Sequence, residues 1–274
     1  MLFDVRECWL GGHPTTVRTR VAWNPGLELV RAVCAMTRSG AQPEILIGCP
    51  VIEREWVIER WLEHVGAATS LAGVAADVLL LGPTRDLTFV RGREVARRIG
   101  IRLIEVDSGE EVGSGNRGGL GAWRVWNERR LIHMVWLRNQ LLGAVRELGP
   151  RFFLSLDSDV LLHEMSLAYM LETCSTFDFA AVGGKTNMTP RGEDVPNCAW
   201  IEESGRLARR SAASVSRVDV LMAIKLMTPA AYMIDYEFDS RGEDVGWSIA
   251  CARNGLGLGW DGRSTSEHVM AKDV

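Results

Sequence analysis

The sequence has no run of apolar residues as long as the roughly 18 that a membrane-spanning helix needs. Its first residues, MLFDVRECWLGGHP, are acidic and polar where a secretory signal peptide has a basic start and an apolar core. The six cysteines are scattered, without C-x-x-C spacing or the density of a disulfide framework. We therefore expect a cytoplasmic protein with no membrane span and no disulfide scaffold.

Basic residues are also outnumbered by acidic ones, since the chain has 31 Lys and Arg residues and 35 Asp and Glu residues, for a net charge of -4. This balance argues against a surface devoted to nucleic acid. The arginine clusters RGREVARR (91–98) and RLARR (206–210) are expected to be solvated helix faces or mobile loop. The glycine-rich stretch 109–123 lacks the G-K-[ST] ending of a phosphate-binding loop, so we expect a functional loop of another kind.

The 274 residues are 47% hydrophobic, which suits a globular protein with a sizeable core. Apolar runs alternate with helical spacing through the first half, and this order predicts an α/β fold with a mostly parallel central sheet flanked by helices. The expected strands there are 44–51, 76–83 and 101–108, and the expected helices are 54–68, 87–100 and a long one that stops near Gly149-Pro150.

The second half is less regular. We expect a strand at 151–160, a helix at 163–174, a strand at 178–185, a polar irregular stretch at 186–216, one or two strands at 218–234 and a helix from 243. We interpret 44–270 as one main domain, 1–43 as an N-terminal extension packed on it and 271–274 as a tail.

The strongest chemical signal is FFLSLDSDV, an apolar strand that ends in Asp157, Ser158 and Asp159. Ligands of open parallel sheets bind beyond the carboxyl ends of the strands. Residues at i and i+2 of an extended segment point to the same side, so the two carboxylates can converge on one hard cation. The alternative is a turn in which both acids cap the helix that starts near His163.

The pentapeptide RGEDV occurs twice, at 191–195 and at 241–245. The first copy is followed by Pro196, so its acids are expected in a polar loop. The second copy opens a helix, where Glu243 and Asp244 also suit the positive end of the helix dipole. The second copy is therefore the better candidate for chemistry.

These segments together resemble nucleotide-sugar-dependent glycosyltransferases with the GT-A fold, especially family 2-like enzymes. LRNQLLGAVRELGPRFFLSLDSDVLL is similar to the family's Arg-Asn helix followed by a strand ending in a D-x-D motif, and GEDVGWSIACARNGLGLGWDG is similar to its acceptor-side segment. The chain departs from the family after the second strand, where LGPTRD stands in place of an Asp-Asp-Gly-Ser-type segment and leaves Asp86 as a loose match.

The resemblance implies a nucleotide-diphosphate sugar as donor and Mn²⁺ or Mg²⁺ as cofactor. By position it implies metal ligation by Asp157, Asp159 and His268, and a general base at Asp244 with Glu243 beside it. The implied donor-binding residues are Pro50, Val51, Asp86, Arg138, Asp157, Ser158 and Asp159.

In the implied reaction the metal neutralises the leaving diphosphate and Asp244 removes the proton of the acceptor hydroxyl, which inverts the sugar. A retaining mechanism could use the same D-x-D site without that base. The acceptor is left open among protein, glycan, lipid head group and modified nucleic acid, and so is the oligomeric state. Two other hypotheses are a haloacid dehalogenase-type phosphatase with Asp157 as nucleophile and a non-catalytic nucleotide-sugar-binding module.

Overall fold

The computed structural model describes residues 43–109, 127–188, 193–209 and 214–269, but not the side chains of 187, 188 and 193–195. It also describes two short paired strands near the N-terminus, β1 (Cys8–Leu10) and β2 (His13–Thr15). Most of the expected extension, the loop at 109–123 and the tail lie outside the described residues. The division of the chain into extension, domain and tail stays a prediction.

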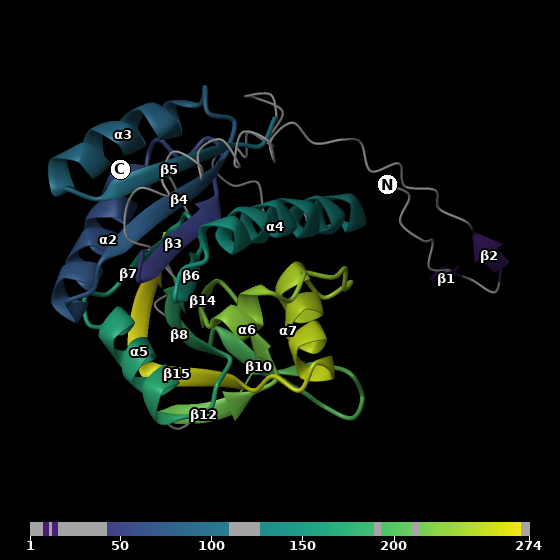
Figure 1. Ribbon diagram of the computed structural model, residues 1–274. Helices are drawn as coiled ribbons and strands as arrows, with labels where there is room; N and C mark the ends of the chain where they lie inside the picture. The colour runs from purple at the N-terminus through teal and green to yellow at the C-terminus, as the bar shows by residue number, and fades with distance from the viewer. Residues whose placement is uncertain are drawn as a thin grey trace.

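One large sheet organises the fold (Figure 1). In spatial order its main strands are β12 (Val215–Val218), β15 (Leu258–His268), β8 (Ala181–Met188), β14 (Ile224–Met227), β6 (Phe152–Leu156), β3 (Ile45–Pro50), β4 (Ala76–Gly82) and β5 (Arg102–Asp107). Two short strands pair beside this order, β7 (Val160–Leu162) with β15 and β9 (Glu193–Val195) with β8. Along this order β14 and β12 run against the direction shared by the other strands. The predicted α/β fold with a mostly parallel sheet is confirmed.

Helices cover both faces of the sheet because its strands are apolar on both sides. In β3, Ile45 and Ile47 pack into one hydrophobic cluster and Leu46 into another. The first cluster includes residues of α2 (Ile58–Ala72), α3 (Leu87–Ile99) and α5 (Ser166–Thr176), and the second includes residues of α4 (Glu128–Leu148), α6 (Pro229–Tyr232) and α7 (Glu243–Arg253). Of the helices in the described ranges, none combines the length and the apolar character that crossing a membrane requires.

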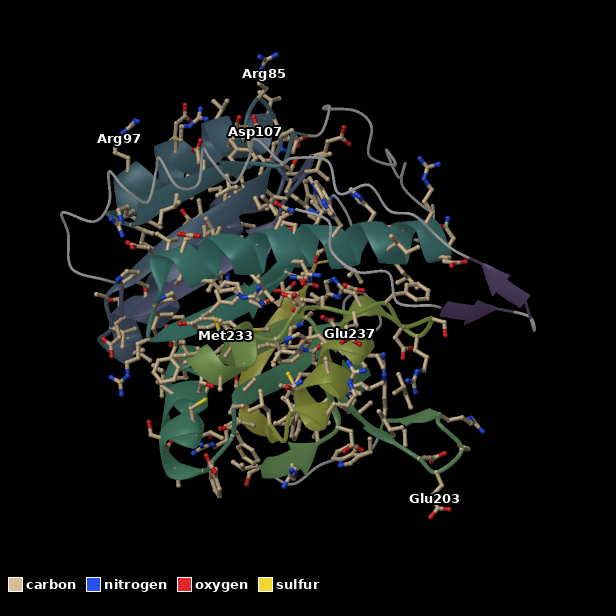
Figure 2. All side chains as sticks on the ribbon, turned by 45° about the vertical axis from the view of Figure 1, so that its right-hand side comes forward. Arg85, Arg97, Asp107, Glu203, Met233 and Glu237 are labelled. Carbon is tan, nitrogen blue, oxygen red and sulfur yellow. The ribbon has the colours of Figure 1, made fainter. Side chains whose placement is uncertain are left out.

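The strand and helix units of the first half form as predicted. The apolar spacing expected for α2 places Trp61 and Val65 fully inside the core. α3 begins after Asp86, whose carboxylate accepts the Thr88 N–H, and it ends at Gly100 in the left-handed conformation that glycine adopts easily. The arginines of α3 lie on its exposed side, and Arg97 points away from the fold (Figure 2). The solvated helix face expected at 91–98 is confirmed.

The prediction for 151–160 is wrong as a single strand. β6 ends at Leu156, and a turn separates it from β7 because the N–H of Val160 bonds back to the carbonyl of Asp157 at 3.0 Å. The helix expected from 163 begins instead at Ser166 and has no side-chain cap. The alternative in which Asp157 and Asp159 cap that helix therefore finds no support.

The stretch at 186–216 is more regular than its polar composition suggests. It contains β9, β10 (Cys198–Ile201) and β11 (Leu207–Ala208), and β10 lies between β11 and β13 (Val220–Leu221) in a small separate sheet. Glu193 and Asp194, the acids of the first RGEDV copy, are thus on a strand that pairs with β8, and the prediction of a polar loop for them is wrong. The segment predicted as one or two strands at 218–234 ends in α6, because Pro229 is well suited to the first helical position.

Candidate active site

The D-x-D residues stand on a turn at the carboxyl edge of the parallel strands. The N–H of Asp157 donates to the carbonyl of Ala223 at 3.1 Å, and its own carbonyl accepts the Trp61 Nε1–H at 3.0 Å. Ser158 is buried within the turn. The backbone is therefore held from β14 and from α2, and it presents two carboxylates where open α/β sheets bind ligands.

Asp159 is nearly buried and lies among cationic or protonatable groups. It is 3% exposed, its Oδ2 lies 3.7 Å from a guanidinium nitrogen of Arg54, and its Oδ1 lies 3.3 Å from Nε2 of His268. The carbonyl of Asp159 accepts the N–H of Val269 at 2.8 Å, which ties the turn to the end of β15. The structure thus brings together Asp159 and His268, which are far apart in the sequence.

Asp157 turns toward a different cation. Arg138 of α4 is 2% exposed and donates to Asp157 Oδ1 and, at 3.3 Å, to Ser155 Oγ. Burial opposes the charge on Arg138, but Asp157 together with Tyr236, Asp244 and Glu243 more than offsets it, so the pKa of Arg138 lies well above its ordinary value. The two acids of the motif are therefore each matched by an arginine.

These residues fit a divalent ion only in part. Within the described ranges, no group of three His, Cys, Asp or Glu side chains converges as a metal cage. Asp159 and His268 are close together, whereas Asp157 faces Arg138. Mg²⁺ is commonly held by one or two carboxylates together with substrate phosphates, so the set suits an ion that arrives with a diphosphate better than a permanently caged one.

The Arg-Asn pair of α4 connects the D-x-D turn to the second RGEDV copy. While Arg138 contacts Asp157, the neighbouring Asn139 bonds the backbone of Tyr236 in both directions, accepting its N–H at 2.7 Å and donating to its carbonyl at 3.0 Å. Tyr236 lies on the segment that leads into α7. One helix therefore positions both halves of the site.

Gly246 lets the segment before α7, which includes Glu237, pack closely on the first turn of α7. A Cβ at Gly246 would lie 1.9 Å from the carbonyl oxygen of Glu237, so any side chain there would push the segment away. The first RGEDV copy is followed by Pro196 and the second by Gly246. Only the second copy is therefore followed by the glycine that this close packing requires.

The acids of the second copy occupy unlike environments. Glu243 is 7% exposed, whereas the Asp244 side chain is 16% exposed and accepts a hydrogen bond from Lys225 Nζ at 2.5 Å. Burial, and then the neighbouring Asp244 carboxylate, raise the pKa of Glu243 to about 7, although Arg138 pulls it the other way. Glu243 therefore changes charge near neutral pH.

The raised pKa of Glu243 predicts a pH-dependent stability. The unfolded chain releases this proton near the ordinary value of 4.5 and the folded chain near 7. The stabilisation is therefore complete below pH 4.5 and disappears as the pH rises through 7. We expect Glu243→Gln to match the wild type in free energy of unfolding near pH 4 and to exceed it by about 3 kcal/mol at pH 8.

Urea unfolding at both pH values measures this difference. The control is Glu237→Gln, because the Glu237 side chain is 51% exposed beside Arg253 and projects from the surface (Figure 2). An equal stability difference at pH 4 and pH 8 for Glu243→Gln would contradict the expectation.

The predicted donor-binding residues of the first half lie around one segment. Pro50 ends β3, and Val51 is buried with its N–H bonded to the carbonyl of Leu81 at 2.8 Å. Asp86 is 2% exposed, and besides capping α3 it accepts the N–H of Glu53 at 2.5 Å. Its two carboxylate oxygens thus serve protein groups, and a direct contact of Asp86 with a donor stays a prediction.

Two residues that the sequence did not single out belong to this constellation. Arg54 reaches Asp159 because its backbone N–H is fixed at 2.8 Å from Thr88 Oγ1, beside the Asp86 cap. Nothing in the local pattern distinguishes Arg54. Lys225 had a signal, since it is the charged residue within the apolar run VLMAIKLM, where a lysine has to find a partner.

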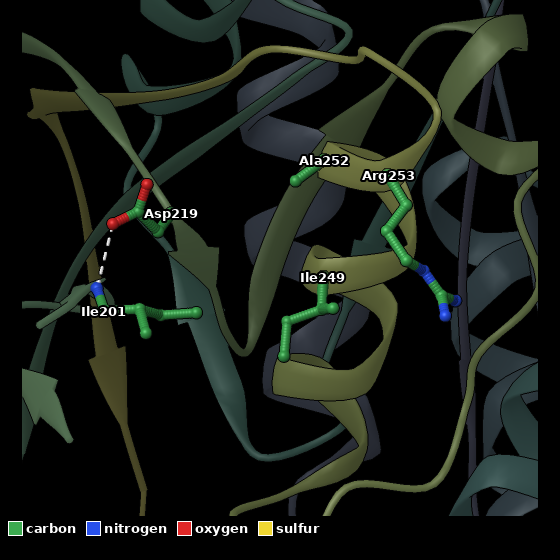
Figure 3. Close-up of a pocket in the computed structure, with 5 residues that line it drawn as sticks. All are labelled: Ile201, Asp219, Ile249, Ala252 and Arg253. Atoms are coloured by element: carbon green, nitrogen blue, oxygen red, sulfur yellow. Dashed lines mark hydrogen bonds between the residues drawn. The ribbon is translucent and has the colours of Figure 1, made fainter. Parts of the chain in front are cut away.

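A cavity of about 440 Å³ lies elsewhere, beside the C-terminal half of α7 (Figure 3). Its lining residues are Ile201, Asp219, Ile249, Ala252 and Arg253, and Asp219 Oδ2 accepts the Ile201 N–H at 2.8 Å. None of these lining residues is a candidate catalytic group. The site is therefore defined by the convergence of charged side chains and not by this cavity.

The sequence matches no family model. It also matches no curated protein. A solved structure described as a mycobacterial protein aligns with 92% of this chain and 73% of its own at 14% identity, with a TM-score of 0.49.

Two glycosyltransferase structures align more closely in shape. S. aureus TarS in complex with UDP-GlcNAc matches 83% of this chain at 13% identity with a TM-score of 0.50. GalNAc-T7 with UDP, GalNAc and Mn²⁺ matches 84% of it at 11% identity with a TM-score of 0.53. The protein has the GT-A fold. The aligned part makes up 56% of the TarS chain and 44% of GalNAc-T7, so this GT-A chain spans about half the length of these neighbours.

Proposed function

We propose that this GT-A protein is a glycosyltransferase that moves a sugar from a nucleoside-diphosphate donor to an acceptor hydroxyl. The observation that carries the proposal is that α4 contacts both parts of the site. Its Arg138 donates to Asp157 of the D-x-D turn, and its Asn139 bonds the backbone of Tyr236 on the segment that leads into α7. A single helix, α4, thereby contacts both the proposed donor site and the segment that leads into the acceptor-side acid pair, as the alignment of two substrates requires.

The donor diphosphate is proposed to lie over the D-x-D turn, with the nucleoside toward Pro50 and Val51. Arg54 contributes positive charge there, since its guanidinium already faces Asp159. Arg138 of α4 pairs with Asp157 and orients its carboxylate. These cations oppose the negative charge that builds on the departing diphosphate.

Asp159 and His268 are the residues proposed to hold Mn²⁺ or Mg²⁺, with Asp157 on the same turn. Once bound with the donor, the ion supplies Lewis-acid neutralisation of the diphosphate. GalNAc-T7 was solved with UDP and Mn²⁺, which supports testing this pair first.

On the acceptor side, Asp244 is proposed to take the proton of the attacking hydroxyl. The hydroxyl oxygen forms a bond to the anomeric carbon as the bond from that carbon to the diphosphate oxygen breaks, and the electron pair leaves with the nucleoside diphosphate. Attack from the face opposite the leaving group inverts the anomeric configuration. Glu243, whose pKa lies near 7, provides a second carboxyl next to the base.

A panel of nucleotide sugars, screened by thermal shift with and without Mn²⁺, tests the proposal. UDP sugars come first, because the TarS and GalNAc-T7 structures contain UDP-GlcNAc and UDP. A ligand that binds only the folded state at 100 times its Kd adds about 2.7 kcal/mol to stability. We expect one donor to raise Tm in the presence of Mn²⁺ and much less in its absence.

Two other outcomes would redirect the assignment. Release of phosphate from an aryl phosphate, lost in Asp157→Asn, would support a phosphatase of the haloacid dehalogenase type. Donor binding without hydrolysis or transfer, for every acceptor class tried, would support a binding module.

A further inference from the structure

Lys225 is a fully buried cation on the central sheet. It lies on β14, is 0% exposed, and its Nζ donates to the Met222 carbonyl at 2.8 Å and to Asp244 Oδ1 at 2.5 Å. The rings of Tyr236 and Trp247 flank the ammonium, with centroids 5.7 and 5.8 Å away. An ammonium enclosed in this way interacts with Asp244 across a low-dielectric space.

The burial of Lys225 is not explained by fold stability alone. An apolar residue of similar volume often serves a core as well as, or better than, a buried ion pair. The neighbours of Lys225 on β14 are apolar and buried, as expected for a central strand. The cation therefore calls for a role that an apolar side chain could not fill.

The charged groups around Asp244 come from several elements. Lys225 faces it from β14 and Glu243 adjoins it on α7, while Arg138 of α4 and Tyr236 of the preceding segment also interact with it electrostatically. Asp157 acts on Lys225 from the D-x-D turn. Burial lowers the pKa of Lys225, but Asp244, Tyr236 and Asp157 together more than offset this and the net change is upward, so the lysine stays charged at neutral pH.

We propose that Lys225 is a positioning residue that holds the Asp244 carboxylate in one orientation for proton abstraction. The inference rests on the proposed function, in which Asp244 is the base. Lys225 occupies Oδ1 from inside the fold, and the partly exposed carboxylate keeps Oδ2 for the acceptor hydroxyl. Lys225 touches no reacting atom and acts only through Asp244.

A double-mutant cycle on transfer kinetics tests this dependence. The variants are Lys225→Met, Asp244→Asn and the double substitution, each assayed for kcat, donor Kd and Tm. We expect Lys225→Met to lower kcat about 10- to 100-fold with donor Kd unchanged, within the range for losing part of general-base catalysis. The double variant should be no slower than Asp244→Asn, because without the base the lysine has nothing to position.

Rescue by a conservative variant supplies a readout that a purely structural role would not move. Lys225→Arg keeps the charge and a donor for Asp244, so it should restore part of the rate that Lys225→Met loses. It also serves as the second variant if the methionine substitution does not fold.

Arg102→Met is the matched control. Arg102 pairs with Asp77, which is 8% exposed, at the amino ends of β4 and β5, away from the carboxyl edge that bears the site. This variant is expected to lose stability with kcat unchanged. Losses that multiply in the double variant, or a Lys225→Arg variant as slow as Lys225→Met, would overturn the proposal while wild-type transfer is unaffected. A wild type that neither transfers nor hydrolyses any nucleotide sugar would overturn the proposed function itself.

Discussion

Asp244→Asn is expected to lower the rate of sugar transfer by about 10²- to 10⁴-fold, the usual contribution of a general base. The amide keeps the size of the side chain but cannot accept the acceptor proton. Donor affinity should be unchanged, because the donor is proposed to lie over the D-x-D turn and not over α7. Initial rates at saturating donor, with donor Kd measured separately, make the comparison.

Asp194→Asn is the matched control, since Asp194 occupies the same place in the other RGEDV copy. It lies on β9, opposite Asn187 of β8, and on no helix start. We expect transfer by this variant to stay within about twofold of wild type, as for a residue that takes no part in proton transfer. Equal losses in the two variants would show that the repeat has no specialised copy.

Asp159→Asn is expected to lower donor turnover at least about a hundredfold, because charge neutralisation at the leaving group is worth several kcal/mol. The substitution keeps the backbone bond from Val269 to the carbonyl of residue 159, so the turn has reason to persist. It removes the carboxylate that lies between Arg54 and His268. Hydrolysis of the donor identified by thermal shift, followed at several Mn²⁺ concentrations, measures the effect.

Asp107→Asn controls for the loss of an acid at this edge. Asp107 also ends a parallel strand, β5, but it lies beside α3 and bonds Thr84 and the N–H of Gly109 (Figure 2). Its variant should turn over the donor at the wild-type rate. If chelation of divalent ions leaves wild-type turnover unchanged while Arg54→Met abolishes it, the cation at the leaving group is the guanidinium and not a metal.

The sequence pattern was sufficient to predict those elements whose structure is decided by residues close together in the chain. The apolar run of β3 is satisfied by burial on both faces and the helical spacing of α2 by one buried face, so these elements form as the sequence predicts. The break between β6 and β7 could not be seen this way, because Asp157 is drawn into a turn by bonds from α2 and β14. Pairing with β8 likewise turns the polar residues of β9 into a strand.

The candidate site shows the same division. Asp157, Asp159, Glu243 and Asp244 stand out by position, since acids that end an apolar strand or open a helix carry a local signal. Their partners Arg54, Arg138 and Lys225 come from other elements, and the sequence holds no record of those distances. The adjacent Arg138 and Asn139 illustrate the limit, because one contacts the D-x-D turn and the other the approach to α7.

By itself, then, the sequence determined the order of strands and helices in the first half, the α/β class and the acids that carry charge at the strand and helix ends. Tertiary structure alone decided which RGEDV copy lies beside a buried lysine and a close-packed glycine, and which cation faces each acid of the D-x-D turn. The physical reason is the distance along the chain over which each interaction acts. Helix and strand propensity act over a few residues, whereas the orientation of Asp244 depends on Lys225, which reaches it only when β14 and α7 pack together.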